Sequence, residues 1–180
     1  MKKILKLMTF ALLTFSLFAC GESRKKITEE ELREAQTILF NENGTLNTAE
    51  APKVAEKYCQ FVKQNPDDTA SVKWLYHAME INVMLENANK SIEIGNQLLK
   101  QFPQSNWAPQ TLLTLGSFVY NDQLNDTAQA HIMFQRLIDE YPNSVYVSDA
   151  KKSIEYLGLT PEEITSLFIT SQMEIVEDSL

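Results

Sequence analysis

One short phrase occurs three times in this chain and constrains its fold more than any other feature. Each copy has helical apolar periodicity and contains a proline near its end: AEKYCQFVKQNPDD, SIEIGNQLLKQFPQS and AHIMFQRLIDEYPNS. The prolines Pro66, Pro103 and Pro142 recur at a nearly constant interval. A fixed period of this order is typical of arrays of helical hairpins. The sequence therefore predicts stacked helix pairs.

Alignment on the prolines shows which side chains repeat. Five residues before each proline stands a large apolar residue: Phe61, Leu98 or Leu137. Mostly apolar residues also occur four and eight residues before it. Because positions three and four apart share one face of a helix, this stripe is predicted to be buried. The residue before a proline disfavours the α conformation, so each helix is expected to end there.

A polar residue follows each proline by two positions: Asp68, Ser105 and Ser144. Side-chain oxygens of these types accept hydrogen bonds from the free N–H groups at a helix start, so all three are predicted N-caps. Thr28 with Glu31, and Thr160 with Glu163, each have capping-box spacing. The helices are expected at about 27–40, 48–65, 69–86, 89–102, 106–121, 125–140 and 145–157, with a last one from 160.

These segments predict an all-α fold of about eight helices. No segment has a convincing strand period, and the chain has only 5 glycines. The loops are short, which makes successive helices antiparallel neighbours.

The repeated phrase resembles the tetratricopeptide repeat, in which a small residue, an aromatic, an apolar residue and a proline follow in this order. The third copy fits best, with Ala130, Phe134, Leu137 and Pro142, whereas the second has Ser91 and Gly95 at the first two places. The units here are longer than the period of about 34 residues that is usual in that family. The resemblance covers roughly residues 48–170. It implies a right-handed superhelical array of antiparallel helix pairs.

The longer unit and the turn Tyr141-Pro142-Asn143-Ser144 look like the repeats of outer-membrane assembly and cell-envelope lipoproteins. The stretch that contains this turn is similar to the end of small tetratricopeptide lipoproteins. This similarity is specific for fold and weak for function, because one fold serves many functions.

The N-terminus has the pattern of a secretory signal peptide, residues 1–19. Lys2, Lys3 and Lys6 precede an apolar run at 7–19, which is too short for a membrane span. The junction Leu17-Phe18-Ala19-Cys20 resembles the lipobox of bacterial lipoproteins. That resemblance implies a diacylglycerol on the Cys20 thiol and an acylated amine. The alternative is an ordinary signal peptide cleaved at Ala19.

The domain plan then follows as a lipidated tether at 20–27, a tetratricopeptide-like domain at 28–176 and a frayed tail at 177–180. Several acyl chains give stable membrane anchoring. Gly21 in place of an aspartate after Cys20 favours the outer membrane by the sorting rule of enteric bacteria. Whether the domain faces the periplasm or the outside stays open.

Charge limits the range of partners. Without the three signal-peptide lysines, residues 20–180 carry 13 basic against 24 acidic residues, a net charge of −11. Such a chain is not expected to bind nucleic acid or to attach electrostatically to anionic lipid. The lipid on Cys20 is the predicted membrane attachment.

No residue pattern suggests an enzyme, a cofactor or a metal. His77 and His131 lie far apart in the sequence, with no ligand spacing around them. Cys59 lies on the apolar face, where a small buried hydrophobe is the simpler interpretation than a nucleophile. No phosphate loop, nucleophile elbow or serine triad order occurs.

The favoured function is a non-enzymatic scaffold that binds envelope proteins or their peptide segments. In helix-pair arrays the first helix of each pair usually lines a concave surface. The candidate groove residues on that basis are Lys73, Tyr76, Glu80, Gln110, Ser117, Tyr120 and Asn121.

Two further hypotheses remain open. An accessory lipoprotein that binds glycan or peptidoglycan would stack sugar on an exposed Trp107 and on Tyr120. In addition, Asp-Thr-Ala occurs at Thr69 and at Thr127, and resembles a periplasmic O-glycosylation signal of some Gram-negative bacteria. Helix capping by the aspartate explains the same three residues.

Overall fold

The computed structural model describes residues 26–167 and 169, and helices account for most of them. In order they are α1 (Glu29–Gln36), α2 (Ala51–Gln64), α3 (Thr69–Met84), α4 (Ala88–Gln101), α5 (Trp107–Thr114), η1 (Leu115–Gln123), α6 (Thr127–Glu140) and α7 (Val147–Tyr156). The segment η1 is a π-helix that continues α5 without a break. A further helical stretch begins at Pro161. The described part has no strand, only one isolated bridge between Phe40 and Leu46. The all-α prediction is confirmed.

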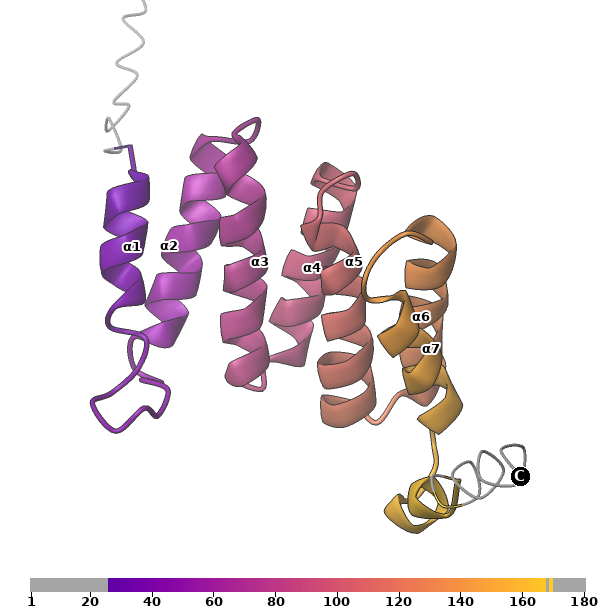
Figure 1. Cartoon of the computed structure of the whole chain (residues 1–180). Helices are drawn as coiled ribbons and strands as arrows, with labels where there is room; N and C mark the ends of the chain where they lie inside the picture. Colours follow the sequence, from indigo (N-terminus) through magenta and orange to yellow (C-terminus); the bar gives the residue numbers. More distant parts are fainter. Residues whose placement is uncertain (1–25, 168, 170–180) are drawn as a thin grey trace, which may run out of the picture.

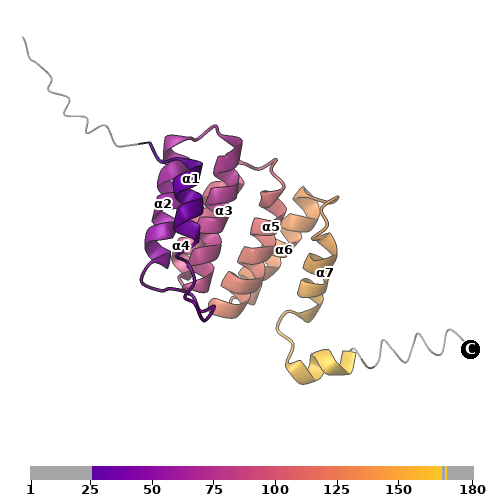
Figure 2. The same ribbon diagram turned by 60° about the vertical axis from the view of Figure 1, so that its left-hand side comes forward.

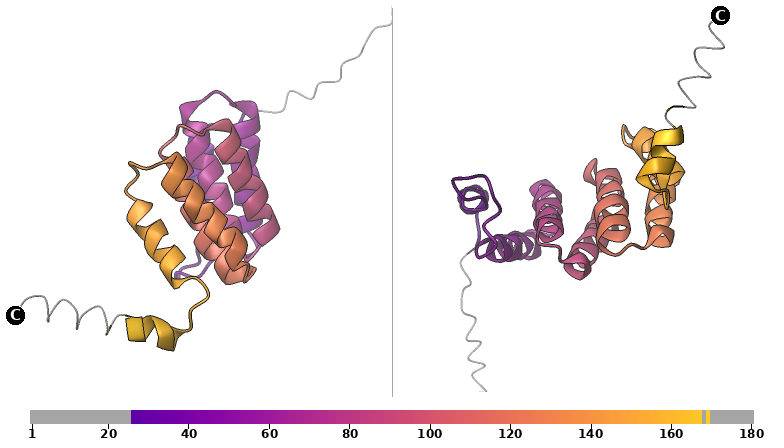
Figure 3. Two further views of the ribbon diagram at one scale, coloured as in Figure 1. Left: turned by 90° about the vertical axis from the view of Figure 1, so that its right-hand side faces the viewer. Right: turned by 90° about the horizontal axis from the view of Figure 1, so that it is seen from below.

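The helices stand side by side and alternate in direction (Figure 1). Each contacts its neighbours in the chain, α2 with α3, α3 with α4, and α6 with both η1 and α7. Seen along the helix axes, α1, α3 and α5 lie in one row and α2 and α4 in the other (Figure 3, right). The two rows are offset, and the stretch after Pro161 extends away from the end of α7 (Figure 2). We call α1, α3 and α5 the first row, and their side chains share one face of the array.

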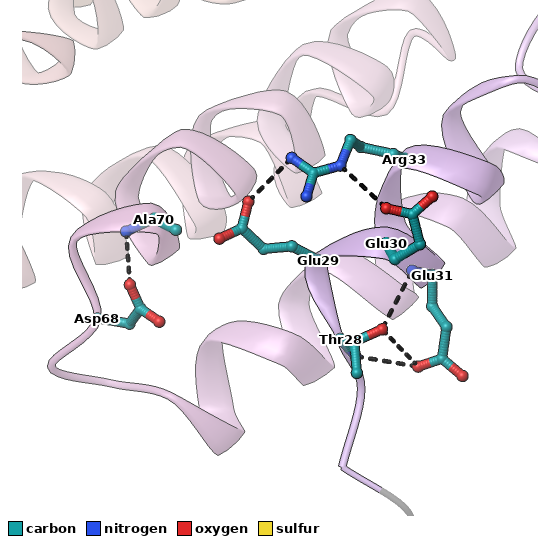
Figure 4. A network of polar contacts seen from close by, with 7 residues as sticks. All are labelled: Thr28, Glu29, Glu30, Glu31, Arg33, Asp68 and Ala70. Carbon is teal, nitrogen blue, oxygen red and sulfur yellow. Dashed lines mark hydrogen bonds and ion pairs between the residues drawn. The ribbon is translucent and has the colours of Figure 1, made fainter.

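Hydrogen bonds at the helix starts confirm several predicted caps (Figure 4). Thr28 and Glu31 form a full capping box, in which the Glu31 N–H donates to Thr28 Oγ1 and the Thr28 N–H to Glu31 Oε2. Asp68 accepts from the Ala70 N–H at 2.9 Å. Arg33 lies within 3.4 Å of Glu29 and 3.6 Å of Glu30, so the acidic first turn carries its own cation.

Two predicted caps differ from the prediction. Helix α5 begins after Asn106, and the buried Ser105 hydroxyl has no hydrogen-bond partner in the described part of the chain. Ser144 accepts from the Tyr146 N–H at 3.3 Å, but α7 begins only at Val147. The backbone closes in the same way in all three proline turns, where Asp68, Ser105 and Ser144 donate their N–H groups to the carbonyls of Asn65, Phe102 and Tyr141. The turns differ in how soon the next helix begins, at Thr69, Trp107 and Val147.

The proline turns repeat in three dimensions. Helices α2, α4 and α6 end one residue before Asn65, Phe102 and Tyr141, the residues that precede the prolines. Those three residues share a non-helical backbone, with φ between −136° and −130° and ψ between 51° and 59°. The steric effect of the following proline explains the common end point.

The predicted stripe forms the core. Phe61, Leu98 and Leu137 are all buried, at 3%, 0% and 0% exposure. Tyr58, Gly95 and Phe134, eight residues before each proline, are buried as well. The first predicted helix is shorter than expected, because the chain leaves α1 at Gln36 and turns back at Gly44, which has φ +80°.

Candidate functional site: a groove lined by alternate helices

One groove runs across the face that the first-row helices share. It has a volume of about 760 Å³, within the range of about 300–1,000 Å³ common for ligand pockets. Its wall takes residues from α1 and the loop after it, from α3, from α5 with η1, and from the start of α7: Gln36, Leu39, Phe40, Tyr76, His77, Glu80, Ile81, Val83, Met84, Gln110, Leu113, Thr114, Ser117, Phe118, Tyr146, Asp149 and Ser153, with Tyr58 from α2. The groove thus spans α1, α3, α5 with η1, and α7, which are alternate elements of the array.

The structure brings together four of the seven side chains predicted to face a groove: Tyr76, Glu80, Gln110 and Ser117. The other three lie elsewhere. Lys73 is exposed, with its ammonium 4.9 Å from the ring centre of Trp74. Tyr120 is half-buried outside the groove, and Asn121 lines a separate hollow near the loop at Gly158.

Tyr76 belongs to the wall of the groove and to the core at once. Only 3% of it is exposed, and its hydroxyl lies 3.2 Å from Thr114 Oγ1, which ties α3 to α5. Its ring packs on Trp107 at 4.8 Å between centres. Burial raises the pKa of Tyr76, so the phenol stays neutral.

His77 and Glu80 form the polar contact beside this wall. The imidazole Nδ1 lies 2.8 Å from Glu80 Oε2, one turn along α3. The same imidazole ring packs edge-on against Trp107, at 5.7 Å between ring centres. These contacts fix the direction of the Glu80 carboxylate, which keeps about 39% of its side chain exposed.

An exposed apolar trio lines the groove nearer the ends of α1 and α3. Phe40, Met84 and Phe118 are 50%, 45% and 54% exposed, and they come from the loop after α1, the end of α3 and η1. Three large apolar side chains in one groove form a patch of the kind that marks an interaction surface. Sequence reasoning missed the trio, because the buried stripe was predicted for α2, α4 and α6 and none of the three residues lies in those helices.

The π-helix η1 contains Phe118, which follows the groove residue Thr114 by four positions. Its last hydrogen bond joins the Leu124 N–H to the Val119 carbonyl, five residues back, at 3.0 Å. Gln123 Nε2 donates to the Val83 carbonyl at 2.8 Å, which fastens the end of η1 to the end of α3. A π-helix of 9 residues is long for this class of helix, which is often found at functional sites.

The groove carries negative charge. Glu80 and Asp149 line it, and no lysine or arginine is among its lining residues in the described part of the chain. Asp149 is exposed, and no basic side chain of residues 26–167 lies within ion-pair distance of it. The fixed carboxylates therefore favour a cationic group in the groove.

Cys59 has none of the properties of a reactive thiol. It is buried, and burial raises the pKa of its thiol to about 11, with the nearby Glu56 adding to the effect. A thiol at that pKa is almost wholly protonated at neutral pH, whereas the thiolate is the nucleophile. Among the described residues, no group of three His, Cys, Asp or Glu side chains has the arrangement of a metal site.

The remaining predicted site residues differ in how far they are exposed. Trp107 is half-buried and packs on Tyr76 and His77, so part of the ring surface that a sugar would need is occupied. Thr69 is exposed and Thr127 half-buried, each as the first residue of a helix. The aspartates before them cap those helices, Asp126 by accepting from the Gln129 N–H at 3.0 Å. Cys20 and the tail at 177–180 lie outside the described residues.

No protein-family model, no curated protein and no solved structure matches this chain. Within the described residues, no helix has the length and apolar character needed to cross a bilayer.

Proposed function

We propose that this protein is a lipid-anchored scaffold that binds peptide segments of envelope proteins in the groove between its first-row helices. The groove itself carries the proposal. It collects side chains from α1, α3, α5 with η1 and α7, so an elongated ligand contacts several helices, as in peptide recognition by helical arrays. Contacts distributed over several helices in this way suit the binding of an elongated segment.

The architecture supports a tetratricopeptide-like arrangement of the helices. Helices alternate between two rows, and the three proline turns repeat one backbone geometry. In a right-handed superhelical array of such pairs, the first helix of each pair lines the concave side. The groove lies on the row of α1, α3 and α5, the row that this arrangement requires.

The anchor is part of the same proposal. Acylation of Cys20 in an outer-membrane lipoprotein would hold the array close to the membrane surface, with residues 20–27 as a short tether. A fixed position of this kind raises the local concentration of partners in the same membrane.

Site-specific photo-cross-linking in intact cells tests the proposed groove. A benzophenone amino acid replaces Phe118 in the groove or Ile132 on α6, two apolar positions that are 54% and 44% exposed. Ultraviolet light should give discrete protein adducts from position 118 and none of the same mass from position 132. Equal adducts from both positions, or none from position 118, would show that the groove is not the binding surface.

A further inference from the structure

The lining of the groove changes character along its length. The helices α1, α3 and α5 run in the same direction, so the order of residues along each one gives the level in the groove (Figure 1). The hydroxyl contact between Tyr76 and Thr114 sets α3 against α5. Glu80 lies one turn beyond Tyr76, and Met84 one turn beyond Glu80. Phe118 likewise lies one turn beyond Thr114. Glu80 and Phe118 therefore lie at about the same level of the groove, and Met84 lies one turn beyond them, about 6 Å along the axis.

Among the described residues, neither carboxylate that lines the groove has a partner of fixed positive charge. Glu80 contacts only the imidazole of His77 as a possible cation, and Asp149 has no basic partner within the described residues. Apolar side chains on the groove wall lower the local polarity, which strengthens an ion pair formed there relative to one on an open surface. The only lysine of α3, Lys73, lies outside the groove over the Trp74 ring.

We infer that the groove selects peptide segments in which a lysine or arginine has two or more large apolar side chains within one helical turn of it. The basic group pairs with Glu80 and Asp149, and the apolar side chains cover Phe40, Met84 and Phe118. This inference rests on the proposed function and names the class of segment that the groove accepts. An acidic segment is rejected by the same carboxylates, and this includes the chain's own residues 170–180, which carry three acids and no base.

Four fluorescein-labelled peptides test the inference by fluorescence anisotropy against the full mature chain in phosphatidylcholine nanodiscs, with empty nanodiscs as the blank. The first is a short probe of glutamine and serine that contains one lysine next to two leucines and a phenylalanine. The second replaces its lysine by glutamate, and the third replaces its apolar residues by serine. The fourth has the sequence of residues 170–180. The first should bind at least roughly fivefold more tightly than each of the others.

Protein variants locate the effect. Glu80→Gln with Asp149→Asn should weaken the lysine probe roughly fivefold or more and leave the glutamate probe no weaker. The matched control, Glu93→Gln with Glu155→Gln, removes the same charge from exposed positions on α4 and α7 that do not line the groove, and should leave binding unchanged. Asp149→Asn is also tested alone, because Asp149 forms no ion pair within the described residues that the substitution would break. Circular dichroism checks that each variant is folded.

The outcomes separate this inference from the proposed function. If the lysine and glutamate probes bind equally and Phe118→Ser weakens both, the groove binds peptides but the selection for a base is overturned. If the control pair weakens binding as much as the groove pair, only net charge acts, and the inference fails. If the peptide of residues 170–180 binds most tightly, the groove serves the chain's own tail, and the inference fails as well. If neither Phe118→Ser nor the carboxylate pair changes the binding of any probe, the proposed groove function fails too.

Discussion

Replacing Gly116 by alanine should destabilise the protein, although alanine is the better helix former. A Cβ at this position in η1 would stand 2.6 Å from Phe134 Cε1, 2.9 Å from Cδ1 and 3.0 Å from Cζ. The ring is 1% exposed, so it has little free space in which to retreat. Overpacking of this kind costs about 1–3 kcal/mol. Alanine regains at most about 1 kcal/mol in helix propensity. The contact at 2.6 Å places the overpacking in the upper part of that range, about 2–3 kcal/mol, so the net loss is about 1–2 kcal/mol and the thermal midpoint falls by roughly 2–8 °C.

The assay is thermal unfolding followed by circular dichroism in the far ultraviolet, with two companion variants. Phe134→Leu removes the rigid ring, so the double variant with Gly116→Ala should be less destabilised than the sum of the single changes. Gly95→Ala places its Cβ 2.9 Å from the tip of Leu115 and 3.0 Å from the sulfur of Met79, flexible ends that can shift, so it should cost less than Gly116→Ala. A stability that is unchanged or raised by Gly116→Ala, or strict additivity with Phe134→Leu, would refute the close-packing argument.

Three other predictions concern the core, the buried titratable groups and the anchor. Leu137→Ala, at 0% exposure, should cost about 2–5 kcal/mol in urea unfolding, whereas Ile132→Ala, 44% exposed on the same helix, should change stability far less; similar losses would mean the buried face is misassigned. Burial raises the pKa of Cys59 to about 11 and of Tyr58 to about 12, from ordinary values of 9.0 and 10.0. Their protonated forms therefore stabilise the fold below pH 9, and the thermal midpoint should fall as the pH rises from 9 to 12, less so in Cys59→Ala. Cys20→Ser should release the protein from the detergent phase or leave it uncleaved; unchanged partition would contradict acylation at Cys20.

Local rules made the core predictable from the sequence. A proline restricts the residue before it, and a helix repeats its faces every three or four residues, so the position of each proline also fixed the phase of the stripe through Leu98 and Leu137. Both are fully buried. The caps were less predictable, because the three turns close by the same backbone hydrogen bond but the next helix begins one, two or three residues after Asp68, Ser105 and Ser144. Only Asp68, among the three residues two positions after a proline, caps its helix through the side chain.

The position of the groove followed from helix order, but its outline required the structure. The row of first helices was the expected one, and it supplied Tyr76, Glu80 and Gln110. The apolar trio depends on tertiary placement, since Phe40 lies in a loop and Met84 at a helix end, where periodicity carries no information about the facing surface. Their exposure is visible only when α1, α3 and η1 are set side by side.

The change from α-helix to π-helix accounts for the two predicted groove residues after Ser117 that lie outside the groove. In an α-helix, the residues three and four positions after Ser117 would share its face, and these are Tyr120 and Asn121. In η1 the hydrogen bonds join residues five apart, so each turn takes up more residues and the stripe moves. Phe118, four residues after Thr114, lines the groove, whereas Tyr120 lies outside it. The unit between Pro103 and Pro142 is the longer of the two proline intervals, and a wider helix accommodates extra residues in a rod of limited length. The surface proposed to bind peptides therefore presents the exposed Phe118, while Tyr120 lies outside it.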